Sequence, residues 1–156
     1  MAIVRDEVTV EMVATPERVW TLVSDVTRMG EWSPICTRCE RLDGSTEPRV
    51  GSRFIGYSRQ SGTRSSRECV VTACEPGREF AFDTLFRGEV SNRWRYHFES
   101  VPAGTSVTES YEVFVMPRWV RVLRRIPGMV GRSRRDARRG MQVTLEKIKA
   151  TAERVT

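Results

Sequence analysis

The sequence of 156 residues contains no uncharged apolar run close to the roughly 18 residues that a membrane-spanning helix requires. Its first residues, MAIVRDEV, carry three charged side chains at positions 5–7, which excludes the unbroken apolar region of a secretory signal peptide. Internal repeats, low-complexity tracts and linkers are also missing. We therefore expect a single soluble domain over residues 1–156, located in the cytoplasm.

Histidine is almost absent, because His97 is the only one in the chain. A Ser-His-Asp triad or a Cys-His pair would have to include this residue. In the surrounding pattern His97 shares one strand face with Arg93, Arg95 and Glu99, and we expect a face of that composition to contact water. The sequence therefore argues against nucleophilic catalysis that depends on histidine.

Only four cysteines are present, and in a cytoplasmic protein we expect them to be free thiols. Cys36 and Cys39 have the spacing of a zinc knuckle, and Cys69 and Cys74 would complete a four-sulfur site. However, residues three apart on a strand face opposite ways. We therefore expect no metal site and no cofactor, and we interpret the cysteines as small residues of the core or of a cavity wall.

Lysine is scarce as well, with 2 lysines against 24 arginines, and the charge is unevenly distributed. Residues 1–117 hold 14 basic and 17 acidic residues and carry a net charge of −3. Residues 118–156 hold 12 basic and 3 acidic residues and carry +9. The arginines that dominate this basic segment are Arg118, Arg121, Arg124, Arg125, Arg132, Arg134, Arg135, Arg138 and Arg139.

Three interpretations of the segment Arg118–Arg139 stay open: a solvated basic face, a lid or contact surface for an anionic membrane, and a nucleic-acid site. Clustered arginine is attracted to anionic lipid, and Trp119, among these arginines, is a side chain typical of the membrane interface. No helix-turn-helix, RNA-binding or zinc-finger pattern supports nucleic acid, so we do not expect that partner. The sequence does not distinguish a monomer from a homodimer.

The elements that are present follow clear hydrophobic periods. Alternation over residues 3–12 predicts a half-buried strand. Thr15 and Pro16 are typical of a helix start, and we expect this helix to end near Ser24 or Asp25, followed by a short helix over Thr27–Trp32. Turn-forming residues then separate six further predicted strands, at 35–43, 52–59, 65–74, 78–85, 91–101 and 106–115.

The end of the chain predicts a long amphipathic helix from about Ser133, with apolar residues at spacings of three and four up to Ala152. Gly140 lies inside this helix at a cost of about 1 kcal/mol against alanine, which indicates that another group approaches closely there. The element order predicts an α+β fold, with a seven-stranded curved antiparallel sheet around the long helix. One helix cannot cover the whole concave face, so we expect a cavity between them.

Several segments, taken in their order and spacing, point to a known family. They cover nearly the whole chain, although each is short. The segments are 14–20 (ATPERVW) with Asp25, 31–34 (EWSP), 50–54 (VGSRF), 75–78 (EPGR), 94–96 (WRY), 104–111 (GTSVTESY) and 139–145 (RGMQVTL).

With these motifs the sequence resembles the polyketide cyclase/dehydrase and lipid-transport group of the START/Bet v 1-like (SRPBCC) superfamily. The resemblance implies a helix-grip fold and a cavity that binds an apolar or aromatic small molecule. Some members catalyse aromatic polyketide cyclisation and dehydration. A tyrosine and a cavity arginine of those enzymes correspond to Cys39 and Cys74 here, whereas Trp94 and Thr144 match a wall tryptophan and a polar helix position.

Strand parity places a set of mostly apolar side chains on the concave face, either as a ligand-binding wall or as plain core. Glu109 is the most informative of them, because burial would raise its pKa and suit it to proton transfer. The alternative is a bulge that turns Glu109 into solvent. The candidate cavity residues are Trp32, Phe54, Thr72, Phe82, Trp94, Tyr96, Phe98, Glu109, Tyr111, Met141, Thr144 and Leu145.

The functional hypothesis is a carrier or sensor that binds an apolar or aromatic molecule, lipid or polyketide-like, in this cavity. The alternative is a cyclase or dehydratase in which Glu109 and Tyr111 transfer protons. The sequence leaves open whether there is any catalysis, and it does not identify the ligand.

Overall fold

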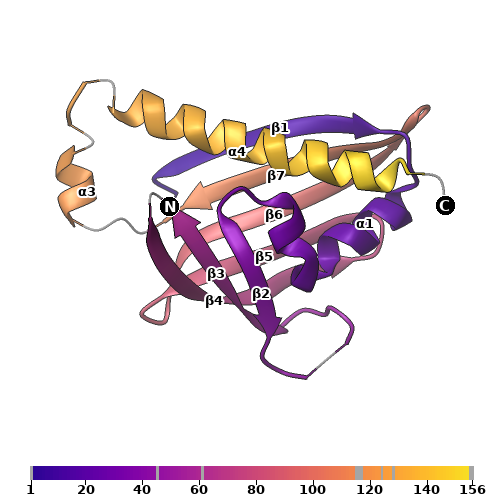
Figure 1. Cartoon of the computed structure of the whole chain (residues 1–156), viewed down its shortest axis with the longest axis horizontal. Coiled ribbons are helices and arrows are strands. Elements are labelled where there is room, and N and C mark those ends of the chain that lie inside the picture. The colour runs from indigo at the N-terminus through magenta and orange to yellow at the C-terminus, as the bar shows by residue number, and fades with distance from the viewer. Residues whose placement is uncertain are drawn as a thin grey trace.

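The computed structural model of the chain describes residues 2–44, 46–60, 62–114, 118–123, 125–127 and 129–154. Within these ranges the chain forms one sheet packed on a long helix (Figure 1). The strands are β1 (Val4–Met12), β2 (Cys36–Arg41), β3 (Arg53–Gln60), β4 (Thr63–Glu75), β5 (Glu79–Phe86), β6 (Glu89–Val101) and β7 (Gly104–Val113). The helices are α1 (Pro16–Ser24), the 3-10 helix η1 (Val26–Arg28), α2 (Met29–Trp32), α3 (Arg118–Leu123) and α4 (Met129–Ala152).

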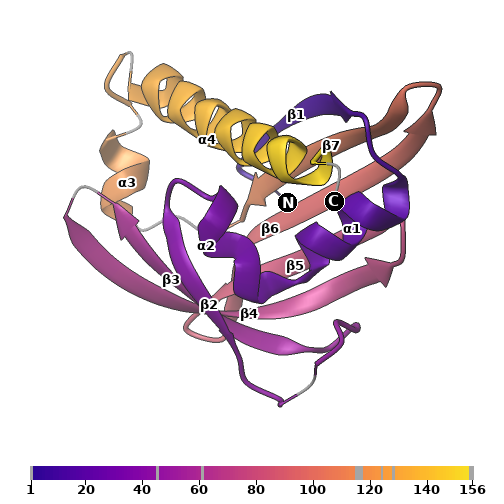
Figure 2. The same cartoon turned by 45° about the vertical axis from the view of Figure 1, so that its right-hand side comes forward.

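The sheet is antiparallel throughout, in the order β1-β7-β6-β5-β4-β3-β2. The strands β2 to β7 are neighbours in sequence order, joined by short turns except between β2 and β3, which residues 42–52 connect. β1 pairs with β7, so the first and last strands lie side by side. The sheet curves around α4, and α1 lies beside the C-terminal half of that helix (Figures 1 and 2). This confirms the predicted α+β helix-grip architecture with two short helical segments after the first strand.

Local sequence explains how the first helices begin and how close they lie to the sheet. The Thr15 Oγ1 accepts a hydrogen bond from the Arg18 N–H at 3.3 Å and so caps α1, as predicted. In α2, a Cβ added to Gly30 would lie 2.2 Å from the Thr37 carbonyl oxygen of β2. Only glycine therefore allows α2 to pack this closely on β2.

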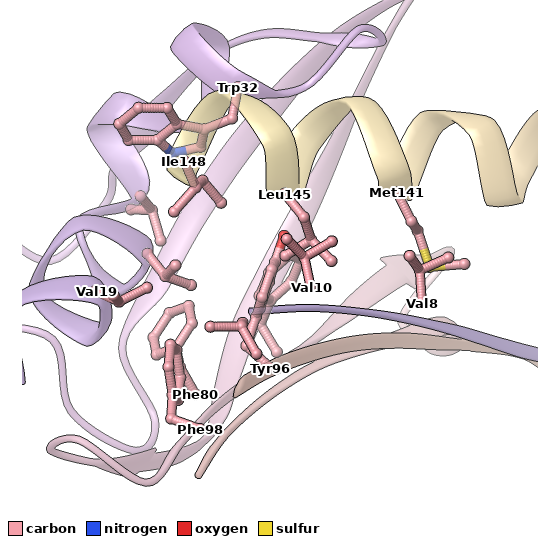
Figure 3. Close-up of a cluster of buried hydrophobic side chains, with 14 of the residues drawn as sticks. Val8, Val10, Val19, Trp32, Phe80, Tyr96, Phe98, Met141, Leu145 and Ile148 are labelled. Carbon is pink, nitrogen blue, oxygen red and sulfur yellow. The ribbon is translucent and has the colours of Figure 1, made fainter. Parts of the chain in front are cut away.

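The second half of α4 closes one end of the curved sheet with large apolar side chains. Leu145 and Ile148 are 0% exposed. They pack in one buried cluster with Val19 of α1, Trp32 of α2 and Phe80 of β5 (Figure 3). This end of the molecule is a solid core.

The first half of α4 is held to the sheet by charge. The Arg138 guanidinium pairs with the buried carboxylate of Asp6 on β1 at 2.6 Å. The helix begins at Met129, earlier than the predicted start near Ser133. At Gly140, an added Cβ would meet only Pro34 Cγ, at an ordinary 3.8 Å, so the predicted close approach is wrong.

Three β-bulges interrupt the otherwise regular alternation of the sheet. One lies in β2 between Cys36 and Arg38, and one lies in β4 between Val71 and Ala73. The third lies in β6, where Thr84 and Leu85 of β5 pair with Asn92 and Val90 and Ser91 has no partner in the ladder. A bulge adds one residue to one strand, so the side chains beyond it change faces relative to a regular count. The predicted strand ends agree with the structure to within two residues, apart from residue 115, which lies outside the described residues.

Candidate functional site

A cavity of about 440 Å³ lies between the middle of α4 and the concave face of the sheet. On the helix side it is lined by Ala137, Gly140, Met141 and Thr144. Ala137, Gly140 and Thr144 are small and follow one another at spacings of three and four, so at these positions α4 leaves space beneath it. Leu145, next to Thr144, and Ile148, one turn after it, are buried in the core cluster and do not line the cavity. Small side chains at three positions of one helix therefore help to keep the cavity open.

Aromatic side chains from four strands form much of the cavity wall. The Trp94 and Tyr111 ring centroids lie 5.4 Å apart with the planes tilted by 30°. Phe54 and Phe82 meet edge to face at 5.2 Å. The expected cavity residues that line the space are Phe54, Phe82, Trp94, Tyr96, Glu109, Tyr111, Met141 and Thr144.

Four expected cavity residues lie elsewhere. Trp32, Phe98 and Leu145 are at most 3% exposed and belong to the core cluster. Thr72 is exposed, which corrects its expected place in the cavity. The physical reason is the β4 bulge, because it leaves Thr72 without a partner on β5 and turns Val71 inward.

The first two cysteines lie differently relative to each other than their spacing predicts. The β2 bulge puts the thiols of Cys36 and Cys39 on the same side, with 3.5 Å between the sulfur atoms, so the expectation of opposite faces is wrong. Both line the cavity together with Cys69, while the Cys74 thiol contacts the Pro48 carbonyl at 3.4 Å. Across the described ranges, no three His, Cys, Asp or Glu side chains come together as a metal site.

The sequence did not point to some of the lining residues. Gly56 on β3 and Gly140 on α4 have no side chain to mark a wall, and Met29 lines the cavity from α2. The small residues Ala137, Gly140 and Thr144 at helical spacing were a usable signal, although Met141 lines the cavity among them.

Glu109 carries the only carboxylate that lines the cavity within the described residues. It lies on β7, is 3% exposed and pairs across the strands with Val8 and Tyr96. The Tyr96 hydroxyl donates a hydrogen bond to Glu109 Oε1 at 2.9 Å. In the described part of the chain Oε2 has no hydrogen-bond partner. The inward parity predicted for Glu109 is confirmed, and the bulge that would have turned it outward does not occur in β7.

Burial fixes the protonation of this pair. Removal from water raises the pKa of Glu109 to about 8, although the hydrogen bond from Tyr96 acts in the opposite direction. Burial and the neighbouring carboxyl group both raise the pKa of Tyr96. Near neutral pH the site therefore holds a protonated phenol, whose one proton is given to Glu109 Oε1, and a protonated carboxyl group that can donate a hydrogen bond from Oε2 to a ligand oxygen.

The convex face of the sheet is charged and exposed, as predicted. His97 is exposed there on β6, together with Arg95 and Glu99. Arg93 makes a two-bond ion pair with the buried Asp83, at 2.7 and 3.0 Å. The single histidine therefore lies on the face opposite the cavity.

The basic segment contributes an exposed apolar face. Trp119 and Val122 of α3 and the nearby Ile126 are 67%, 63% and 51% exposed. Arg118 and Arg125 beside them are exposed as well, whereas Arg124 lies outside the described residues. None of the helices in the described ranges combines the length and apolar character needed to cross a membrane.

The chain matches one protein family and is similar to several solved structures. A family model described as polyketide cyclase/dehydrase and lipid transport matches residues 1–153. Among curated proteins, none matches the sequence. Among solved structures, a Polyketide_cyc-like protein from Corynebacterium glutamicum is 30% identical, with a TM-score of 0.55, and the match covers 96% of this chain and 89% of that one.

Two further structures share the fold at lower identity. The di-domain ARO/CYC StfQ from the steffimycin biosynthetic pathway has a TM-score of 0.78 and 16% identity, over 97% of this chain and 51% of StfQ. This chain thus spans about half the length of that protein. The Zhui aromatase/cyclase from Streptomyces sp. R1128 has a TM-score of 0.72 and 16% identity, over 97% of this chain and 94% of that one.

The raised pKa of Glu109 predicts a pH-dependent stability that a single substitution removes. The folded protein keeps this proton up to about pH 8, whereas in the unfolded chain the carboxyl group has its ordinary pKa of 4.5. The contribution of Glu109 to the free energy of unfolding is therefore fully present below pH 4.5. It is lost as the pH rises to 8, by no more than about 1.4 kcal/mol per pH unit. Glu109→Gln should become more stable relative to wild type across this window, measured by urea unfolding.

The exposed Glu99→Gln variant on β6 is the matched control, because it removes a carboxyl group from the convex face. Its stability relative to wild type should stay constant over the same pH range. A constant difference for Glu109→Gln as well would show that the buried carboxyl group titrates normally.

Proposed function

This chain belongs to the polyketide cyclase/dehydrase and lipid transport family, and we propose that it binds an apolar or aromatic small molecule, lipid or polyketide-like, as a carrier or sensor. The cavity itself is the observation that carries this proposal. Protein interiors are packed like organic crystals and leave few voids larger than a water molecule. Here the space is about 440 Å³, which lies in the range of about 300–1,000 Å³ found for small-molecule sites.

The side chains of the cavity wall favour a ligand that has an apolar body and a polar oxygen. The flat rings of Trp94, Tyr111 and Phe82 offer stacking surfaces for a planar or unsaturated molecule. Within this apolar wall, protonated Glu109 offers a donor at Oε2, because the Tyr96 hydroxyl already gives its one proton to Oε1. A ligand with an apolar body and a carbonyl or hydroxyl oxygen at one position satisfies both features, because an unpaired buried carboxyl group costs about 1–3 kcal/mol.

Filling the cavity from β3 tests the binding proposal. A Cβ added to Gly56 would meet only Cys39 Sγ, at 3.7 Å, so a larger side chain can enter the cavity without striking the backbone. We expect wild-type protein to bind the neutral fluorescent probe N-phenyl-1-naphthylamine. Gly56→Leu should weaken this binding at least about tenfold, which is about 1.4 kcal/mol. Fluorescence titration measures both affinities.

Ser66→Leu adds the same side chain to an exposed position of the neighbouring strand β4 and serves as the control. It should bind the probe like wild type, and thermal unfolding should show that both variants are folded. Equal affinity of all three proteins would place the probe outside the cavity and contradict the proposal.

An enzyme of the cyclase or dehydratase type is the second candidate, and the Tyr96–Glu109 pair favours it. A carboxyl group with a pKa near 8 can both give and accept a proton near neutral pH. Against this, Cys39 and Cys74 occupy the positions where the enzymes resembled have a tyrosine and an arginine, and Cys74 is not part of the cavity wall. Tyr111, the other candidate for proton transfer, lines the cavity with its ring against Trp94.

Substitution of Glu109 separates the enzyme from the carrier. If the protein is a cyclase, it should accelerate ring closure and loss of water from a linear poly-β-ketone, followed by mass spectrometry. Glu109→Gln should then lose about 10²- to 10⁴-fold of this rate, the usual contribution of a general acid–base, while still binding the probe. A rate in wild type no faster than in Gly56→Leu would leave the carrier or sensor as the function.

We further propose that an anionic membrane surface is the partner that delivers or receives the ligand. Trp119, Val122 and Ile126 form an exposed apolar face flanked by Arg118 and Arg125. α3 lies at the end of the molecule where α4 begins, the same end at which α4 covers the cavity (Figures 1 and 2). Apolar side chains insert at the headgroup boundary, and each arginine near anionic lipid adds about 1 kcal/mol.

Vesicle sedimentation tests this contact. Wild-type protein should sediment with vesicles that contain phosphatidylglycerol and remain in solution with pure phosphatidylcholine. The Trp119→Ser/Val122→Ser variant should lose most of this binding, because it removes the apolar face while keeping the charge. Val13→Ser/Val50→Ser, at sites that are 69% and 64% exposed elsewhere, is the control and should bind like wild type. Equal binding by all three proteins would contradict a contact through α3.

A further inference from the structure

The bulge in β2 gives Cys36 and Cys39 a relation that their spacing in the sequence does not suggest. Cys36 pairs with Ser58 of β3, and Cys39 pairs with Gly56, only two residues away on that strand. The two cysteines are therefore separated like neighbours on one face of a strand, about 6.6 Å at 3.3 Å per residue. Disulfides join Cα atoms about 4.4–6.8 Å apart, so this spacing lies within the range.

The bulged residue is held in place by its surroundings. Thr37 has no partner in the ladder, and its hydroxyl donates a hydrogen bond to the Tyr57 carbonyl at 3.1 Å. Its own carbonyl lies against Gly30 of α2, where no side chain would fit. The contact between the two thiols is thus fixed by packing of α2 on β2 as well as by the strand itself.

The two thiols differ in their environment. Cys36 is half-buried and lines the cavity, so a small molecule in solution can reach it. Cys39 is buried, 6% exposed, and its sulfur lies 3.5 Å from Cys36 Sγ and 3.8 Å from Met29 Sδ. The pair therefore has one accessible sulfur and one sheltered sulfur in direct contact.

The order of ionisation follows from the same contact. The hydrogen bond from Cys39, together with backbone N–H groups, lowers the pKa of Cys36. The hydrogen bond to Cys36 and burial raise the pKa of Cys39. The accessible thiol is thus the first to become a thiolate, which is the reactive form of cysteine.

We propose that Cys36 and Cys39 form a redox-active dithiol in the cavity wall, which closes to a disulfide by exchange with a low-molecular-weight disulfide such as oxidised glutathione. The Cys36 thiolate attacks one sulfur of that disulfide, forms a mixed disulfide and releases one glutathione thiolate. Cys39 then loses its proton to solvent and attacks Cys36 Sγ, which releases the second glutathione thiolate. The two cysteines lose two electrons, the small disulfide gains them, and the two protons end on glutathione.

This dithiol does not depend on the ligand or on any catalysis in the cavity. Formation of the disulfide is a reversible covalent change in the part of the cavity wall that Cys36, Cys39 and Cys69 line. Cys69 stays outside the exchange because it is 4% exposed and burial raises the pKa of its thiol to about 11.

Redox titration with peptide mapping tests the proposal. The protein is equilibrated without oxygen in mixtures of reduced and oxidised glutathione, quenched in acid, blocked with a maleimide and digested with trypsin. Trypsin cuts after Arg38, between the two cysteines, so peptides 29–38 and 39–41 stay together only through a Cys36–Cys39 disulfide. We expect this linked pair to accumulate as the oxidised share rises, while Cys69 and Cys74 are recovered blocked.

Two variants provide the controls. In Cys39→Ser the reaction should stop at the mixed disulfide, so glutathione on Cys36 should rise about tenfold or more over wild type. Cys74→Ser, outside the cavity wall, should give the same linked peptides as wild type. The proposal is overturned if wild type accumulates glutathione on Cys36 without the link. A link through Cys69, or a Cys36 that stays free at every ratio, would overturn it too.

Discussion

One helix must cover the concave face of seven strands, and the rest of the structure depends on how it does so. α4 carries large side chains where α1 and α2 also pack on the sheet, and there Leu145 and Ile148 complete a solid core. In its middle the helix carries the small residues Ala137, Gly140 and Thr144, and the space beneath them remains open. Core and cavity thus adjoin along one element, and Met141 contributes to both.

The buried carboxyl group of Glu109 has a cost that packing alone does not explain. An apolar residue between Val107 and Tyr111 would avoid the loss of hydration and the unsatisfied oxygen atom. The Tyr96 hydroxyl offsets only part of this, since it reaches one of the two oxygens. Such a group in the middle of an aromatic wall makes sense where a bound molecule supplies the missing partner. The same reasoning does not apply to Asp83, which has its partner in Arg93 on the convex face.

Alternation was enough to predict the architecture, the inward face of β7 including Glu109, and the inward face of β6 beyond its bulge at Ser91. It failed where a strand contains a bulge, as at Thr72 and between Cys36 and Cys39. A bulge depends on how two strands and the helix above them fit together, so the local sequence does not reveal it. Strand parity also could not distinguish cavity residues from core residues. Phe98 and Tyr96 lie on the same face of β6, but α1 packs near one end of that strand and leaves the other end uncovered.

The small side chains in the middle of α4 also bear on how this protein can diverge. Because the turns of a helix rise by about 5.4 Å, Ala137, Gly140 and Thr144 cover successive depths of the cavity. Exchange of any one for a larger residue would shorten the space by a step and leave the Leu145–Ile148 core untouched. The length of the cavity can therefore change over evolutionary time by single replacements that the fold tolerates, with the sheet and its buried carboxyl group kept constant.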